Sequence, residues 1–260
     1  MDAAGLLRQW EDDLASWAIP PEILAGAAGS PWVIPSQVFV NRARTERAAP
    51  SGPSFARAQE FLERPGSVLD VGAGAGAASL PLINRATEII AVDENANLLA
   101  TIGQEARTIV GRWPDVSDHV PAADVVLCHH VLYNVPDIGP FLVELTRHAR
   151  RGVVVELTAR HPLTPLNDLW WQLHGVRRPE RPTAEDVIRI VGALGYEPQV
   201  ERWERPARAE FDSEAELISH TAQRLCLPPE RMGELATALN GRTQPRRELV
   251  TITWSAADAA

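Results

Sequence analysis

The stretch VLDVGAGAGAASLPL, residues 68–82, sets the architecture that the sequence predicts. Its first four residues are rich in apolar side chains, which is typical of a short strand buried on both faces of a parallel sheet. Gly72, Gly74 and Gly76 then alternate with alanines before a segment of helical character. Such a turn lets the backbone approach a ligand closely, because no Cβ stands in the way. The N–H groups at the start of the following helix can hold a polar or anionic group, so the stretch predicts a strand, a ligand-binding loop and a helix.

A second apolar run, residues 88–92, ends in Asp93, about twenty residues beyond the first glycine. In a nucleoside-binding fold, a carboxylate at this position accepts hydrogen bonds from the ribose diol. The alternative of a plain strand-to-helix turn without a ligand does not explain this spacing. Gly72, Gly74 and Ala77 also fit the pattern G-x-G-x-x-A of nicotinamide or flavin dinucleotide sites, so a dinucleotide enzyme is the main competing interpretation.

An acidic residue, Asp70, lies two places before the first glycine. The resulting pattern D-x-G-x-G-x-G resembles the first motif of class I S-adenosylmethionine-dependent methyltransferases. In that family the acidic residue and the glycine loop hold the methionine portion of the cofactor. A carboxylate suits a cofactor that carries an amino group, whereas it would repel a pyrophosphate. The resemblance therefore implies a methyltransferase with S-adenosyl-L-methionine as its cofactor.

Composition limits the class of partner. The chain has 260 residues, of which 45% are hydrophobic, and this is enough for a substantial core. Its formal net charge of −9 argues against a broad basic surface for nucleic acid. Arg42, Arg44 and Arg47 form a local basic cluster, which an RNA methyltransferase would use as a groove and which a solvated helix face explains equally well. We predict a small-molecule methyl acceptor, no nucleic-acid partner and no membrane partner; the sequence leaves the oligomeric state open.

Cysteine usage and the N-terminal segment predict a cytoplasmic protein. The two cysteines, Cys128 and Cys226, lie far apart, which gives neither a disulfide framework nor a zinc spacing. Residues 1–17 contain acidic side chains and no long apolar core, so they do not resemble a secretory signal. No apolar run approaches the length that spans a membrane.

Short apolar runs alternate with helical segments from Val68 onward, the pattern of a parallel sheet with helices on both faces. The predicted strands are residues 67–71, 88–93, 108–111, 124–128, 151–157, 196–204 and 247–254. The predicted helices are residues 76–85, 95–106, 138–149 and 183–194. Thr183 and Asp186 are expected to cap the last of these helices. Seven strands in this order are similar to the methyltransferase sheet, whose last strand is antiparallel. The predicted fold class is α/β, a doubly wound, mostly parallel seven-stranded Rossmann-like sheet.

Two parts of the chain lie outside this pattern. Residues 1–54 are predicted to form an N-terminal helical extension or cap, ahead of a Rossmann-like methyltransferase domain at residues 55–260. Within that domain, residues 213–239 are predicted to be a helical insertion before the last strand. The apolar side chains that recur at helical spacing in the extension are Leu6, Leu7, Trp10, Leu14 and Trp17. The resemblance implies that such an extension folds over the cofactor, which makes Phe39 and Arg42 candidates to line the site.

Ligands of open α/β sheets bind beyond the carboxyl ends of the strands, so residues that follow strands are the candidates for the site. Asp93 is predicted to hold the ribose hydroxyls. After the third strand, many relatives place an acidic residue one position after the glycine to bind the adenine amino group, but this chain has Arg112 there. Trp113 is then a candidate to stack on the adenine, with Asp115 or Asp118 as the carboxylate. The predicted cofactor-binding residues are Asp70, Gly72, Ala73, Gly74, Asp93, Glu94, Arg112, Trp113 and His129.

The densest polar cluster, CHHVLYNVPD at residues 128–137, follows the fourth strand. Histidine titrates near neutral pH and can take a proton from a hydroxyl or an amine as the methyl group arrives. His129, His130 and Tyr133 are therefore the predicted catalytic residues. No third ligand lies at a suitable spacing nearby, so we predict no metal site. The segment after the fifth strand begins near Glu156 and is rich in aromatic and polar residues; it either caps a substrate pocket or forms a surface loop.

The sequence thus predicts a methyltransferase that acts on O or N of a small molecule. The alternatives are an NAD(P)-dependent oxidoreductase, an RNA methyltransferase and a cofactor-binding module without catalysis. The oxidoreductase would need a hydride-handling site, which we do not find in the sequence. The residues do not name the acceptor.

Overall fold

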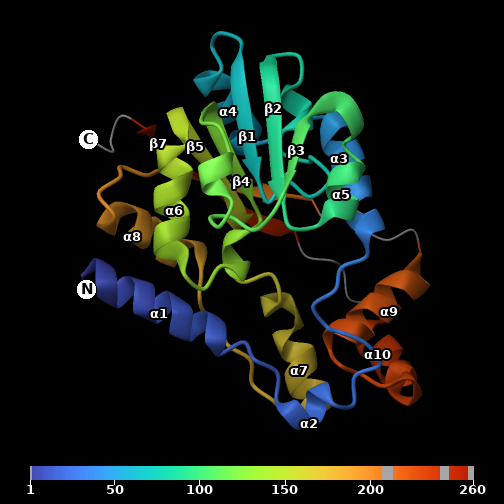
Figure 1. Ribbon diagram of the computed structural model, residues 1–260. Helices are drawn as coiled ribbons and strands as arrows, with labels where there is room; N and C mark the ends of the chain where they lie inside the picture. Colours follow the sequence, from blue (N-terminus) through green and yellow to red (C-terminus); the bar gives the residue numbers. More distant parts are fainter. Residues whose placement is uncertain (1, 207–212, 241–245, 257–260) are drawn as a thin grey trace.

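The computed structural model describes residues 2–206, 213–240 and 246–256, and these residues form one seven-stranded sheet (Figure 1). Its strands are β1 (Gly66–Val71), β2 (Ala86–Asp93), β3 (Arg107–Val110), β4 (Ala123–His129), β5 (Ala149–Thr158), β6 (Gln199–Arg205) and β7 (Arg247–Ser255). Their order is β3-β2-β1-β4-β5-β7-β6. All pairs are parallel except those of β7, which is antiparallel to both β5 and β6. The predicted fold class is confirmed.

Helices flank the sheet and extend below it (Figure 1). They are α1 (Ala3–Ala15), α2 (Pro21–Leu24), α3 (Ser36–Ala48), α4 (Pro53–Phe61), α5 (Ala96–Ala100), α6 (Ile138–Arg147), α7 (Asn167–His174), α8 (Ala184–Ala193), α9 (Glu214–Arg224) and α10 (Met232–Leu239). Short 3₁₀ turns are η1 (Leu80–Leu82), η2 (Gly103–Glu105), η3 (Ser117–His119), η4 (Leu132–Asn134), η5 (Thr164–Leu166) and η6 (Pro229–Arg231). In the described part of the chain, no helix combines the length and the apolar character that a membrane span requires.

The two faces of the sheet bury different helices, because neighbouring residues of a strand point to opposite faces. In β1, Val68 packs in one apolar cluster with Ala58 of α4. Leu69 packs on the other face in a cluster with Leu142 of α6 and Val187 of α8. Both strand residues are fully buried, which explains why β1 reads as an apolar run rather than as an alternating one.

A separate apolar cluster holds together the helices that lie below the sheet in Figure 1, which we call the helical lobe (α2, α7, α9 and α10). Its buried members include Ile19, Leu169, Trp170, Leu225 and Leu235. α9 and α10 fall within the segment predicted as an insertion, residues 213–239. The predicted division between residues 54 and 55 falls near the start of α4, and it stays a prediction.

Two of the predicted helices are wrong in length. Residues 76–85 contain only the 3₁₀ turn η1. Gly76 has φ +82°, a left-handed conformation that is incompatible with the first turn of an α-helix. Residues 95–106 contain only α5 and η2, since the chain turns at Gly103, where φ is +68°. By contrast, the predicted cap of α8 is confirmed: Thr183 and Asp186 form a capping box.

Candidate functional site

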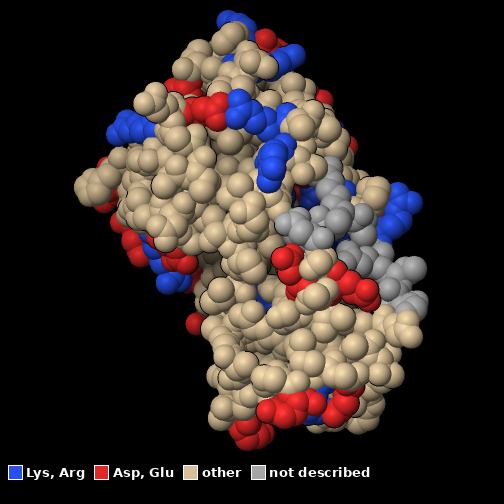
Figure 2. Space-filling model, turned by 90° about the vertical axis from the view of Figure 1, so that its right-hand side faces the viewer, with Lys and Arg blue, Asp and Glu red and all other residues tan. Residues whose placement is uncertain are grey.

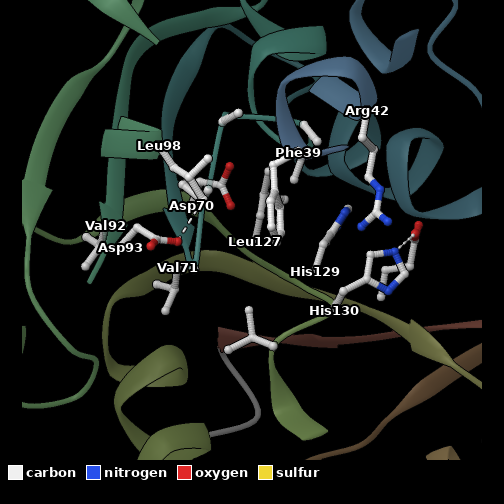
Figure 3. A pocket seen from close by; sticks show the side chains of 18 of the residues that line it. Phe39, Arg42, Asp70, Val71, Val92, Asp93, Leu98, Leu127, His129 and His130 are labelled. Carbon is white, nitrogen blue, oxygen red and sulfur yellow. Dashed lines mark hydrogen bonds and ion pairs between the residues drawn. The ribbon is translucent and has the colours of Figure 1, made fainter. Parts of the chain in front are cut away.

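A cavity of about 730 Å³ opens at the carboxyl ends of β1, β2, β4 and β5 (Figure 3). Its volume lies within the range of about 300–1,000 Å³ that is usual for small-molecule sites. The N-terminal segment contributes one wall, because Phe39 and Arg42 of α3 line the cavity opposite the strand ends. The position also matches the rule that ligands of open α/β sheets bind beyond the strand carboxyl ends.

The glycine loop forms the floor of the cavity next to β1. Its turn is held by the backbone N–H groups of Gly72 and Ala73, which donate to the carbonyl of Val92 over 2.8 and 3.0 Å. Gly72 has φ +72°, and a Cβ there would lie 2.3 Å from Cγ2 of Val131. Gly74 also has a positive φ, of +53°. The loop therefore needs glycine at position 72 both for its backbone conformation and for the close approach of the chain that follows β4.

Asp93 ends β2 beside this loop. One carboxylate oxygen accepts the N–H of Gly74 over 2.8 Å, and the other accepts the N–H of Asn95 over 2.8 Å. Two backbone donors thus orient the carboxylate, and the side chain lines the cavity (Figure 3). Each carboxylate oxygen can accept further hydrogen bonds, so Asp93 has the capacity to bind a diol.

Asp70 lies deeper in the floor and is only 1% exposed. Burial raises the pKa of this carboxyl above its ordinary value, against the effect of the Ser79 hydroxyl, which donates to it over 2.6 Å. A buried carboxyl that lines a cavity is stabilised as an anion when a cationic group binds beside it.

All the residues predicted to bind the cofactor line this one cavity. They are Asp70, Gly72, Ala73, Gly74, Asp93, Glu94, Arg112, Trp113 and His129. Trp113 is 5% exposed, and its indole N–H donates to the Phe141 carbonyl over 3.4 Å, so only part of its ring reaches the cavity. Asp115 and Asp118, the suggested carboxylates for adenine, are exposed and lie outside the cavity lining. The role of each lining residue stays a prediction.

A polar cluster (His129, His130 and Glu156) lies at the other side of the cavity, at the ends of β4 and β5. His130 Nε2 lies 3.0 Å from Oε1 of Glu156. Burial alone would raise the pKa of Glu156, but the hydrogen bond from His130 and the nearby histidines outweigh it and hold the pKa well below its usual range. Burial lowers the pKa of His129, whose Nε2 is buried without a hydrogen-bond partner. An unpartnered buried nitrogen at a cavity wall fits a bound ligand.

Tyr133, predicted to be catalytic, lies outside the lining of the cavity. The 3₁₀ turn η4 directs its ring into the core, where it stacks on Trp10 at 5.9 Å between ring centroids. Its hydroxyl donates to the Thr158 carbonyl over 2.8 Å. His161 packs edge-on against the same ring and is stacked on Trp17, so it too is a core residue.

An ion pair that the sequence analysis did not identify also lines the cavity. Arg205, at the end of β6, contacts Glu46 of α3 over 2.7 Å, and both side chains are largely buried. The two residues lie far apart in the sequence, so no local motif signals the pair. Among the described residues, no group of three possible metal ligands is found.

The sheet order, the antiparallel β7 and the glycine loop in the floor of the cavity are those of a Rossmann-like α/β fold, whose ligands bind beyond the strand carboxyl ends. Residues 69–156, which run from β1 to β5, match the family described as "Methyltransferase domain". The match covers the stretch with the glycine loop and the ends of β1, β2, β4 and β5, and it agrees with the resemblance to class I S-adenosylmethionine-dependent methyltransferases.

Solved structures share this fold. The YcgJ protein of Bacillus subtilis is 17% identical, with a TM-score of 0.53 over 78% of this chain and 97% of that chain. The plantazolicin methyltransferase BamL, solved with a triazolic desmethylPZN analog and SAH, is 14% identical, with a TM-score of 0.51 over 98% of this chain and 100% of that chain. These identities are low, so the likeness is one of fold. No curated protein sequence matches the chain at a significant level.

Proposed function

We propose that the protein transfers the methyl group of S-adenosylmethionine to an oxygen or nitrogen atom of a small molecule. The observation that carries the proposal is one cavity with two chemically different ends. The cofactor end comprises the glycine loop, Asp70 and Asp93, and the acceptor end comprises His129, His130 and Glu156. When bound, the cofactor supplies an electrophilic methyl carbon on a sulfonium, so the protein has to bind, align and exclude water.

Each group of the cofactor end has a task that its chemistry suits. Asp93, already oriented by two backbone N–H groups, would accept the ribose hydroxyls. Asp70, buried under the loop, would face the amino group of the methionine moiety. His129, with its unpartnered Nε2, would lie between the cofactor and the acceptor end.

A small acceptor agrees with the size of the cavity and with the surface. Figure 2 shows one face of the molecule, on which acidic and basic side chains are interspersed. Most of this face is formed by uncharged residues. Arg47, one of the arginines that an RNA-binding groove would use, is paired with Glu105 over 2.6 Å. We therefore favour a small molecule over RNA as the acceptor. Two buried free cysteines agree with a reducing compartment, and the cytoplasm is the location we propose.

Isothermal titration with S-adenosylhomocysteine tests the cofactor part of this proposal. We expect the protein to bind S-adenosylhomocysteine, Asp93→Ala to weaken that binding, and NAD to show no binding under the same conditions. Binding of NAD without binding of S-adenosylhomocysteine would instead favour the oxidoreductase. The acceptor can then be sought with a labelled methyl donor.

A further inference from the structure

His130 and Glu156 are locked together by two contacts at the acceptor end. The backbone N–H of His130 donates to the carbonyl of Glu156 over 2.7 Å, and the ring Nε2 lies 3.0 Å from the carboxylate, the contact drawn as a dashed line at His130 in Figure 3. His130 has φ +60°, which is uncommon for a residue with a side chain. Such conformations persist where the surroundings impose them, and they cluster at functional sites.

The contact with Glu156 determines which ring nitrogen of His130 carries the proton. An ionised carboxylate can only accept hydrogen bonds, so the proton lies on Nε2 and Nδ1 keeps its lone pair. Nδ1 is the ring nitrogen that does not contact Glu156, and the side chain is 23% exposed and lines the cavity. His130 thus presents a proton acceptor to the cavity.

His129 differs from its neighbour in this respect. Its Nε2 has no hydrogen-bond partner among the described residues, so this nitrogen is not held by a carboxylate as Nε2 of His130 is. A base that is oriented by a carboxylate is the arrangement that enzymes use to activate a hydroxyl. Of the two histidines, His130 has this arrangement.

We propose that His130 is the general base of the methyl transfer, that Glu156 is its positioning residue, and that the acceptor is a phenolic hydroxyl. The inference deepens the proposed function and rests on it. It selects one of the two candidate histidines and adds Glu156, which is absent from the predicted site residues.

The proposed step balances in atoms and charge. The acceptor oxygen gives its proton to Nδ1 of His130 and its electron pair to the methyl carbon. The bond between that carbon and sulfur breaks, and its electron pair stays on sulfur. The products are a methyl ether, the thioether S-adenosylhomocysteine and an imidazolium, which Glu156 stabilises until the proton leaves to water.

Two observations favour a phenol over other acceptors. Burial lowers the pKa of His130 despite the hydrogen bond to Glu156, and such a base deprotonates a hydroxyl of phenolic acidity more readily than an aliphatic alcohol. The cavity is also lined by two large apolar side chains that are otherwise exposed, Trp32 at 49% and Val33 at 56%. An aromatic acceptor would cover such side chains.

The first measurement is the tautomer of His130 by ¹⁵N NMR, in the protein saturated with S-adenosylhomocysteine. The signal is assigned by its loss in His130→Gln. We expect a protonated Nε2 and a bare Nδ1 at neutral pH, and a changed tautomer ratio in Glu156→Gln. A protonated Nδ1 in the neutral ring, or a ratio that Glu156→Gln leaves unchanged, would overturn the assignment.

The second measurement is transfer of a labelled methyl group to a panel of substituted phenols, including 4-nitrophenol, which ionises near neutral pH without a base. We expect His130→Gln to lower kcat about 100-fold or more for weakly acidic phenols and less for 4-nitrophenol. S-adenosylhomocysteine affinity should stay within about threefold, since the change lies at the acceptor end.

Glu156→Gln tests positioning through the pH profile. The charged groups that act on His130 are Glu156, which raises its pKa, and Arg42 and Arg205, which lower it; the neighbouring His129 is also titratable. Loss of the carboxylate should move the acidic limb of the kcat profile to lower pH and reduce kcat about tenfold, with KM nearly unchanged. Glu144→Gln is the matched control, because Glu144 pairs with His148 on α6 outside the cavity and should leave the profile unchanged.

The outcomes separate the two proposals. A wild-type protein that does not bind S-adenosylhomocysteine would contradict the proposed function itself. Binding without transfer to any phenol, or transfer only to amines or thiols, would overturn the inferred acceptor class. Transfer to phenols with an unchanged pH profile in Glu156→Gln would overturn the role of Glu156.

Discussion

The two ends of the cavity are built in different ways. The cofactor end depends mainly on backbone geometry: the glycine loop donates and accepts through main-chain groups, and Asp93 is held by the N–H groups of Gly74 and Asn95. The acceptor end depends on side chains, above all the contact between His130, which follows β4, and Glu156 of β5. A backbone-built site needs particular residues in one short stretch, whereas a side-chain-built site can draw on the whole chain. The first kind can bind one cofactor in many relatives, and the second can vary with the acceptor.

The largest expected effect concerns the glycine loop. Gly72→Ala should destabilise the fold by about 4 kcal/mol, because it adds left-handed strain to a clash with Val131 at 2.3 Å. Gly103→Ala is the matched control: its φ of +68° is similar, but nothing lies within 4 Å of the added Cβ. It should cost about 1 kcal/mol. Urea unfolding measures both, and equal losses would mean that the close approach at Gly72 does not constrain the loop.

The next effect is a pH dependence of stability from a buried histidine outside the cavity, His161. Burial lowers the pKa of His161 from 6.5 to about 4, so on acidification the unfolded state binds the proton first. Its contribution is therefore complete above about pH 6.5 and is lost as the pH falls towards about 4, by about 3 kcal/mol in all.

The variant His161→Phe keeps an aromatic ring between Trp17 and Tyr133 but removes this titration. Unfolding free energies at several pH values between 4 and 7 should fall less steeply in the variant. His119→Phe, at an exposed position, should follow the wild-type curve. A slope that His161→Phe leaves unchanged would assign the acid sensitivity to other groups.

A smaller effect is expected for the carboxylate of the cofactor end. Asp93→Ala should weaken S-adenosylhomocysteine binding about 30-fold, or about 2 kcal/mol, because charge-assisted hydrogen bonds to the ribose are lost. Glu88 is exposed and lies near the start of β2, at the other end of the strand from Asp93. Glu88→Ala should therefore change the affinity by less than about twofold. Titration calorimetry compares the two, and similar affinities in both variants would remove Asp93 from the site.

The smallest effect is expected for Trp113. Much of its indole is packed against His148 and the Phe141 carbonyl, so Trp113→Phe should weaken S-adenosylhomocysteine binding only about twofold. Trp171→Phe, on the exposed face of α7, is the control and should leave the affinity unchanged. A loss of tenfold or more would show that the cofactor depends on the indole itself, and would make this region a third, side-chain-built part of the site.

The contrast between the two ends also explains what could be predicted from sequence. Local signals were sufficient for the strand at residues 67–71, for the capping box at Thr183 and for the lining residues of the cofactor end, because each depends on neighbours in the chain. The helix predicted over residues 76–85 is a 3₁₀ turn instead. Helix propensity does not reveal the left-handed conformation of Gly76, which prevents the helix from starting there.

At the acceptor end the sequence was less informative. His129 and His130 could be singled out by their position at the end of a strand. The orientation of the Tyr133 side chain depends instead on its stacking against Trp10 of α1, which is far away in the sequence. The partnership of His130 with Glu156 depends on the register between β4 and β5, where His129 lies opposite Glu156. The pair of Arg205 with Glu46 joins β6 to α3 and depends on the complete tertiary fold.

The position of β7 has a consequence for the order in which the protein is made. Among the described strands, β7 lies between β5 and β6 and is the only neighbour of β6, yet it is the last to be synthesised. Thr251 of β7 lies opposite Glu156 and its hydroxyl contacts that of Ser54 over 2.7 Å. The surroundings of Glu156 are therefore complete only after β7 has paired. Until residues 247–255 have left the ribosome, the nascent chain exposes an edge of β5 that can pair with another chain. Pairing of β7 with β5 removes this exposed edge.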